Sequence, residues 1–287
     1  MTDEVITSVM NLLSEGKTVP EISKILNINK VTIGSYLRTH GIKLNPDKGN
    51  VHYFDVIDSY AKAYIVGFIA ADGAIVKSKT KANPSLTITI KYEDKGVLEF
   101  IKSEIGNEHK LLEIIRPSSY DKSKTIHHIR YAITDKHIVK ALNDIGITYN
   151  KSLTLGNIIE NIPYEYRDAF IIGYFDGDGS VTIREGKYPN DRGFLCYDYS
   201  IYVQIRGTRE FLSGVCKHLN ISTSHIYQND SIPQLSFANK KNTYRFFQCY
   251  NNLPFYYERK YNKFLERINH PSYDKYKQVQ TISSPIE

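Results

Sequence analysis

Two aspartates with equivalent surroundings, Asp72 and Asp178, are the side chains of this sequence best suited to chemistry. Each ends an apolar segment and is followed by a glycine. The first segment, residues 63–74, reads AYIVGFIAADGA, and the second, residues 169–180, reads AFIIGYFDGDGS. The offset between them is 106 residues (178 − 72), which is the size of a small domain. The repeat therefore predicts two structurally similar halves.

Small residues interrupt both segments at the same places. Gly67 and Ala71 lie four positions apart in the first segment, as do Gly173 and Gly177 in the second. Residues four apart share one face of a helix, so each segment presents a face that is almost without side chains. Glycine inside a helix costs about 1 kcal/mol, which indicates a packing reason for its presence. We predict that the two helices pack closely about a two-fold axis and bring the two aspartates together at their C-terminal ends.

A pair of carboxylates in this position predicts a divalent metal. The two charges repel each other, and each lies at the negative end of a helix dipole. Carboxylate oxygens suit Mg²⁺, which keeps several water ligands and binds phosphate oxygens. Such an ion activates water and stabilises the leaving oxygen in phosphodiester hydrolysis. Gly73 and Gly179, which follow the aspartates, fit the C-cap of each helix.

The doubled segment resembles the two motifs of single-chain LAGLIDADG homing endonucleases. The resemblance extends over about residues 53–270. It implies an α+β fold of two αββαββα halves, residues 53–158 and 159–287, related by a pseudo-two-fold axis. It also implies that the antiparallel sheets of the two halves form a saddle over DNA. The implied activity is metal-dependent cleavage of both strands of a long, asymmetric DNA site.

The resemblance assigns roles to particular residues. It implies that Asp72 and Asp178 bind Mg²⁺, with Mn²⁺ or Ca²⁺ able to take its place. We expect their neighbours Ala71 and Gly177 to contribute to the metal site. A basic residue near each scissile phosphate would orient the attacking water or stabilise charge on the phosphate. The candidates for this role are Lys151 and Lys260.

The two copies are not equivalent. Where the second motif has Asp176, the first has Ala70. This position is structural in the family that the motif resembles, so the difference does not argue against catalysis. After the second strand of each half, Asp94 in the first half corresponds to Gly207 in the second. We therefore expect no symmetric role at that position.

Two stretches alternate strictly between apolar and polar residues, which predicts strands with one buried face. Their apolar residues are Leu86, Ile88, Ile90 and Tyr92 in the first half and Tyr199, Ile201, Val203 and Ile205 in the second. The polar faces carry hydrogen-bonding groups of the kind that read base edges. An antiparallel sheet with one solvated face has the same pattern. The candidate DNA contacts on these faces are Thr87, Thr89, Lys91, Thr182, Arg184, Ser200, Tyr202, Gln204 and Arg206.

The N-terminal residues predict a separate module of three short helices. The pattern indicates helices over residues 3–15, from Pro20 and over residues 30–40, with Asn29 as an N-cap. A tight turn before the last helix resembles a helix-turn-helix, so we predict a DNA-binding module at 1–44 and a linker at 45–52. The expected inward face is Ile6, Val9, Met10, Leu13, Ile22, Ile25, Leu26, Ile33, Tyr36 and Leu37. The expected DNA face is Lys30, Thr32, Ser35 and Arg38.

The composition is consistent with this interpretation. The chain has 287 residues, 41% hydrophobic residues and a formal net charge of +6, a mild excess that favours a polyanionic partner. Its three cysteines are widely spaced, which argues against a zinc site built on cysteine pairs and favours a reducing compartment. No apolar run approaches the length of a membrane span. We therefore expect an intracellular protein, cytoplasmic if it is bacterial or phage-encoded, with no membrane partner.

Three functions are compatible with this scaffold. The first is a site-specific endonuclease that acts on double-stranded DNA as a monomer, since two unlike halves in one chain suit an asymmetric site. The second is an RNA maturase. The third is a transcription regulator that binds DNA without cutting it, which the N-terminal module makes plausible. The presence of both Asp72 and Asp178 favours the first over the third.

Overall fold

The structure is a computed structural model, and its two compact units, residues 1–47 and 48–287, are described separately. It describes residues 2–15, 17, 19–42, 49–77, 83–119, 121–189, 195–229 and 232–270. Residues 45–48, the first part of the predicted linker, lie outside the described residues. Within these ranges, no helix is long and apolar enough to cross a membrane.

The first unit consists of three helices around a small core. They are α1 (Asp3–Ser14), α2 (Val19–Leu26) and α3 (Lys30–Thr39). The Asn29 side chain caps α3 by accepting a hydrogen bond of 2.9 Å from the Val31 N–H. Val9, Ile22, Ile33 and Leu37 are fully buried between the helices.

Two residues of the predicted inward face of the first unit are placed differently. Met10 is 40% exposed and Ile25 is 55% exposed. Met10 follows the buried Val9 and Ile25 precedes the partly buried Leu26, and short helices in a small unit bury only a narrow stripe. The prediction that these two side chains point inward was therefore wrong.

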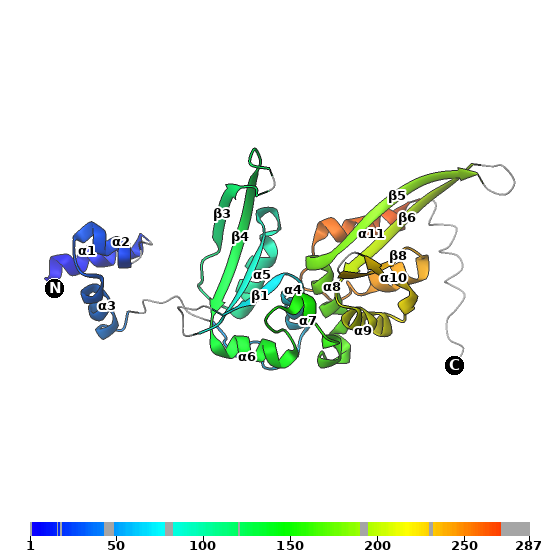
Figure 1. The fold of residues 1–287 in the computed structure, drawn as a ribbon. Helices are drawn as coiled ribbons and strands as arrows, with labels where there is room; N and C mark the ends of the chain where they lie inside the picture. The colour runs from blue at the N-terminus through cyan, green and yellow to red at the C-terminus, as the bar shows by residue number, and fades with distance from the viewer. Residues whose placement is uncertain are drawn as a thin grey trace. The chain divides into compact units, whose positions relative to one another are not determined.

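The second unit contains two halves with the same order of elements (Figure 1). Each half has the predicted αββαββα order, which confirms the α+β fold. The first half comprises α4 (Tyr60–Asp72), β1 (Gly73–Val76), β2 (Ser85–Lys91), α5 (Gly96–Ile105), β3 (Leu112–Pro117), β4 (Thr125–Thr134) and α6 (Lys136–Ile145), followed by the short α7 (Lys151–Thr154). The second comprises α8 (Arg167–Asp178), β5 (Gly179–Pro189), β6 (Leu195–Arg206), α9 (Arg209–Leu219), β7 (Ile226–Asn229), β8 (Ile232–Phe237) and α10 (Lys240–Gln248), followed by α11 (Glu258–Asn269).

The described strands form one antiparallel sheet in each half. The strand orders are β1-β2-β4-β3 and β5-β6-β8-β7, so the two topologies match. In β2 the residues Leu86, Ile88 and Ile90 are buried, whereas Thr89 and Lys91 are exposed. The corresponding apolar residues of β6 are also buried. The alternation predicted from the sequence is thus confirmed in both strands.

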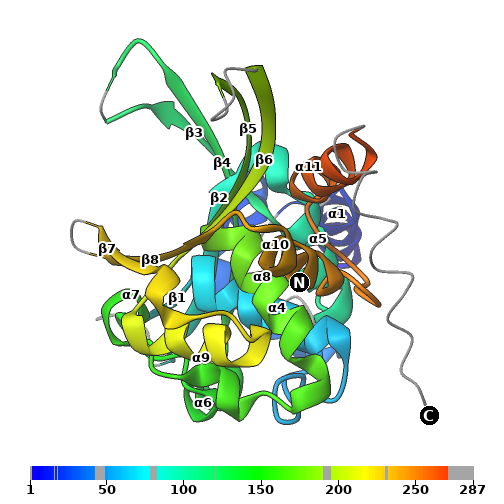
Figure 2. The same cartoon turned by 90° about the vertical axis from the view of Figure 1, so that its right-hand side faces the viewer.

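The two halves meet along α4 and α8. A Cβ atom built on Gly67 would lie 2.0 Å from the Phe170 carbonyl oxygen, and one on Gly173 would lie 2.0 Å from the Tyr64 carbonyl oxygen. No side chain fits at either position, so the backbones approach as closely as the sequence predicted. In Figures 1 and 2, the β3–β4 and β5–β6 hairpins rise on one side of this helix pair, and α6 and α9 lie on the other.

The segment before α4 packs against the first half. The Asn50 N–H donates a hydrogen bond of 2.8 Å to the Ile105 carbonyl oxygen. Tyr53 and Phe54 are buried in the core. Asn50, which the sequence predicted to be part of the linker, therefore contacts the end of α5.

Candidate active site

Asp72 and Asp178 end the two helices whose glycine faces are in contact. A Cβ atom on Gly177 would lie 2.4 Å from the Ala71 Cβ atom and 3.1 Å from the Asp72 Oδ2 atom. The Asp72 carboxylate therefore lies over the glycine that precedes the second aspartate. The structure brings together the four residues that the sequence proposed for a metal site, namely Asp72, Asp178, Ala71 and Gly177.

The electrostatics of the two carboxylates reflect their surroundings. Burial, and then the charge of Asp178, raise the pKa of Asp72 to about 6. Asp178 is more exposed, yet partial desolvation raises its pKa too, against the lowering effect of Lys151, Lys260 and Arg206. The carboxylate pair is therefore destabilised as two anions and would gain from a cation.

The glycines after the two aspartates occupy the C-caps, but for a reason that differs from the expected one. Gly73 and Gly179 have φ values of −74° and −98°, which are not left-handed. A Cβ atom on Gly179 would lie 2.1 Å from the Phe175 Cδ2 atom, and one on Gly73 would lie 2.6 Å from the Ile69 carbonyl oxygen. Close packing against the preceding helical turn, not a positive φ, requires glycine here.

The two candidate lysines lie in corresponding places, beneath the ends of the motif helices. Lys151 begins α7 and Lys260 lies in α11, and both side chains are buried. The Lys151 Nζ atom donates to the carbonyl oxygen of Ala71. The Lys260 Nζ atom donates to those of Phe175, Asp176 and Gly179 at 2.6, 2.8 and 2.8 Å. Both ammonium groups thus add hydrogen bonds and positive charge at the C-terminal ends of the motif helices, where the helix dipole is negative.

The two lysines differ in how many of their ammonium N–H donors are used by these hydrogen bonds. An ammonium group has three N–H donors, and three carbonyl oxygens accept hydrogen bonds from Lys260. Its charge acts on the carboxylates, while its hydrogen bonds hold the end of α8. Burial lowers the pKa of Lys260 to about 8 and also lowers that of Lys151. Contact of either lysine with a phosphate or with the attacking water stays a prediction.

Asp176, the acidic residue that the first motif lacks, has structural contacts. Its Oδ2 atom accepts hydrogen bonds from the Tyr64 hydroxyl at 2.8 Å and from the Tyr257 N–H at 2.9 Å. These bonds connect α8 to α4 and to the segment before α11. Burial raises the pKa of Asp176 to about 6. Ala70 occupies the matching position in the first motif and is buried.

A cavity of about 580 Å³ opens beside Asp72. Its walls include Asp94, which the sequence comparison of the two halves had named, and His128, Tyr257 and Arg259, which the sequence did not single out. Arg259 donates two hydrogen bonds, of 3.1 and 3.0 Å, to the Asp94 carboxylate, which lies 165 positions earlier in the chain. This bidentate pair joins the two halves next to the aspartates. No local sequence signal could have matched the two residues.

The predicted DNA contacts of the second half share one sheet face. Thr182 lies opposite Tyr202 and Arg184 lies opposite Ser200 in the β5–β6 register, and residues opposite each other point the same way. The Arg184 guanidinium lies 4.3 Å from the centre of the Tyr202 ring. Gln204 and Arg206 continue this face along β6.

The matching face of the first half extends beyond the predicted residues. Thr89 lies opposite Arg130 of β4, and the Arg130 Nε atom donates to the Thr89 hydroxyl at 3.1 Å. Lys91 lies opposite His128. The alternation of buried Ile129, Tyr131 and Ile133 with polar neighbours could have identified β4 in the sequence. In the first unit, all four residues of the predicted DNA face, Lys30, Thr32, Ser35 and Arg38, are exposed on α3.

Residues 165–249, which span most of the second half, match the sequence model of the LAGLIDADG-like domain. This part of the chain is similar to a LAGLIDADG-like domain. The resemblance seen in its second motif is thereby confirmed. No curated protein matches the chain.

Similar solved structures include LAGLIDADG meganucleases. I-AabMI bound to uncleaved DNA is 12% identical, with coverage of 78% of this chain and 98% of that chain and a TM-score of 0.49. I-CpaMI bound to uncleaved DNA is 13% identical, with coverage of 78% and 98% and a TM-score of 0.47. I-SmaMI bound to an uncleaved DNA target in the presence of calcium ions is 14% identical, with coverage of 78% and 93% and a TM-score of 0.47.

The donor set at the ends of α4 and α8 fits a hard divalent cation. Asp72 and Asp178 offer carboxylate oxygens, and the Ala71 and Gly177 carbonyl groups lie next to them in the chain. Mg²⁺ and Ca²⁺ prefer such oxygen ligands. The raised pKa values of both aspartates also indicate a site that favours added positive charge.

The raised pKa of Asp72 predicts a pH-dependent cost to stability. Between the ordinary value of 3.8 and about 6, the folded chain binds more protons than the unfolded chain at this group. The contribution of Asp72 to stability therefore falls as the pH rises through this window. In EDTA at pH 7.5, Asp72→Asn should increase the free energy of unfolding by roughly 1–3 kcal/mol, as measured by urea denaturation.

The same substitution should have a much smaller effect at about pH 3, where Asp72 is mostly protonated in both states. Glu99→Gln, which changes an exposed carboxylate on α5, is the matched control. It should alter the free energy of unfolding by no more than about 0.5 kcal/mol at either pH. A loss of stability in Asp72→Asn at pH 7.5 would show that the carboxylate is favourably charged in the folded state, contrary to this account.

Proposed function

We propose that this chain is a site-specific homing endonuclease that hydrolyses one phosphodiester bond in each strand of a long, asymmetric DNA duplex as a monomer. The pairing of Asp72 and Asp178 at the ends of two touching helices carries this proposal. The two carboxylates lie close together where the two polar sheet faces meet. A cation bound between them offsets their repulsion and can also bind a substrate phosphate.

In this proposal the residues of the chain have distinct tasks. Asp72 and Asp178 hold Mg²⁺, for which Mn²⁺ or Ca²⁺ can substitute. The bound ion supplies activation of water and neutralisation of charge on the phosphate. Lys151 and Lys260 hold the ends of the motif helices, so that the carboxylates keep their spacing, and add positive charge beneath the scissile phosphates. Asp94 and Arg259 fix one half against the other beside Asp72.

The polar sheet faces supply the contacts with DNA. In the first half they comprise Thr87, Thr89 and Lys91 together with Arg130, and in the second half Thr182, Arg184, Ser200, Tyr202, Gln204 and Arg206. Side chains of these types hydrogen-bond to base edges and phosphates. Because the two faces differ in sequence, the proposed target is asymmetric.

The direct test is selection of cleaved duplexes from a random library in Mg²⁺. We expect one preferred site, cut in both strands, and no cutting when EDTA replaces Mg²⁺. The recovered site should then be cut when it is placed in an unrelated plasmid. A protein that binds one site tightly but leaves both strands intact in Mg²⁺ or Mn²⁺ would instead be a DNA-binding regulator, and the proposed function would be wrong.

We further propose that residues 1–44 form a helix-turn-helix module that extends the contacted DNA, while residues 53–158 and 159–287 form the cleaving halves. The exposed polar face of α3 supports this division, as does the separate core of the first unit. Equal numbers of acidic and basic residues in this unit indicate weak non-specific affinity.

Deletion of residues 1–44 is therefore expected to weaken binding of an extended site and to leave the cleavage step intact. Affinity should be measured by titration in EDTA, and the single-turnover rate at saturating protein. Replacement of Arg38 by alanine in the full chain should weaken binding in the same direction, by about 1 kcal/mol or more. Loss of cleavage by a folded truncation at saturating concentration would refute this division of labour.

A further inference from the structure

Two histidines and one aspartate converge on the first half, away from the paired aspartates. His52 and Asp55 lie in the segment before α4, and His137 is the second residue of α6. Asp72 is at the opposite end of α4, a helix of 13 residues that spans about 20 Å. The cluster therefore does not belong to the site described above.

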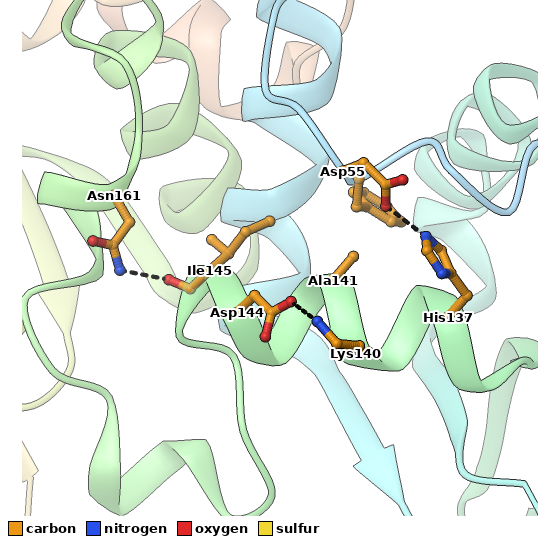
Figure 3. A pocket seen from close by; sticks show the side chains of 8 residues that line it. Asp55, His137, Lys140, Ala141, Asp144, Ile145 and Asn161 are labelled. Carbon is orange, nitrogen blue, oxygen red and sulfur yellow. Dashed lines mark hydrogen bonds and ion pairs between the residues drawn. The ribbon is translucent and has the colours of Figure 1, made fainter.

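The side chains of the cluster face one another. The Asp55 Oδ2 atom lies 2.7 Å from the His52 Nδ1 atom, and the Asp55 Oδ1 atom lies 2.7 Å from the His137 Nε2 atom. Figure 3 shows the Asp55–His137 contact across the rim of a pocket. The two imidazole rings are 4.3 Å apart between centres. One ligand atom from each residue lies within 4.8 Å of those from the other two.

The backbone positions all three residues independently of their side-chain contacts. The Asp55 N–H donates to the His52 carbonyl oxygen at 3.1 Å, which closes a turn, and Phe54 anchors that turn in the core. The His52 N–H donates to the Asn50 side chain at 3.0 Å. The His137 N–H donates to the Asp135 side chain, the N-cap of α6, at 2.8 Å. The cluster is therefore presented by ordered local structure.

We propose that His52, Asp55 and His137 bind one Zn²⁺ ion, which ties the segment before α4 to α6. Two imidazole nitrogens and one carboxylate oxygen are a common ligand set for zinc, with a fourth position left for water. Bonds of about 2.1 Å in a tetrahedral site place ligand atoms about 3.4 Å apart. Asp55 lies 2.7 Å from each imidazole nitrogen, and the three ligand atoms lie within 4.8 Å of one another, so small side-chain rotations produce the site.

The chemistry of the ligands separates this site from the catalytic one. Imidazole suits zinc and related transition metals, whereas Mg²⁺ takes oxygen ligands and keeps its waters. The side chains of His52, Asp55 and His137 are 67%, 38% and 39% exposed, so an ion can reach them from solvent. The neighbouring Lys140 is paired with Asp144 at the same pocket, which limits its repulsion of the ion.

The test is titration of the full chain, stripped with EDTA and dialysed, with ZnCl₂. We expect saturable binding of one equivalent, together with a rise in the thermal midpoint. His137→Ala and His52→Ala should each weaken that binding at least about tenfold, because second-shell changes alone cost that much. His225→Ala, which removes an imidazole from the second half, is the matched control and should leave the affinity unchanged.

A second variant separates this site from the paired aspartates. Zn²⁺ binding should persist in the Asp72→Asn, Asp178→Asn double variant if the ion occupies the histidine cluster. Co²⁺ can replace Zn²⁺ as a probe, and its visible absorption should disappear in His137→Ala but not in the double variant. Absence of saturable binding, affinity unchanged by His137→Ala and His52→Ala, or loss of binding in the double variant would each overturn the proposal. None of these outcomes depends on DNA cleavage.

Discussion

Replacement of either Asp72 or Asp178 by asparagine is expected to abolish double-strand cleavage while leaving binding of the target duplex largely intact. Asparagine keeps the shape of the side chain but removes one of the two charges that hold the cation. The loss of several kcal/mol of metal-based stabilisation corresponds to a fall of at least about 100-fold in the cleavage rate. Single-turnover cleavage of an end-labelled duplex gives the rate, and titration in EDTA gives the affinity.

The two variants should behave alike because the carboxylates act as a pair. Burial and the charge of the other aspartate both act on Asp72, so the loss of one carboxylate changes the environment of the one that remains. Asp58→Asn is the matched control, since Asp58 lies at the opposite end of α4 and pairs with Lys62 near the surface. It should cut at the wild-type rate. Undiminished cutting by Asp72→Asn and Asp178→Asn would remove the assigned active site.

The features that the sequence predicted correctly are those with a local or repeating signal. The glycine faces, the apolar alternation of β2 and β6 and the Asn29 cap each follow from residue spacing within one element. The repeat of 106 residues then relates the two halves without any knowledge of their contacts. Short-range patterns were thus sufficient to predict the fold class and the pairing of Asp72 with Asp178 at one site.

The features that the sequence did not reveal depend on contacts between distant segments. Asp94 and Arg259 are separated by 165 positions, and nothing in the periodicity of either segment selects the other. The three carbonyl partners of Lys260 lie more than 80 positions away. Likewise, the spacing of His52, Asp55 and His137 resembles no zinc motif, because α6 contributes one ligand from a distant part of the chain.

The close contact of α4 and α8 predicts the largest effect on stability. Gly173→Ala is expected to destabilise the second unit by about 3 kcal/mol or more. The added methyl group would lie 2.0 Å from the Tyr64 carbonyl oxygen and 3.0 Å from the Phe68 nitrogen. Both are backbone atoms, so no side-chain rotation relieves the overlap and the helices must separate. The free energy of unfolding should be measured by urea denaturation of the full chain.

The matched control is Gly96→Ala, at the start of α5. Its added methyl group would lie 3.8 Å from the nearest atom, in the Phe255 ring, which is ordinary contact. Because alanine favours the helix over glycine, this variant should be as stable as the wild type or up to about 1 kcal/mol more stable. Separation of the helices also moves Asp72 away from Asp178, so Gly173→Ala should lose cleavage even under conditions in which it remains folded. A Gly173→Ala variant with the wild-type free energy of unfolding would show that the backbones do not touch, and the paired carboxylates would lose their structural basis.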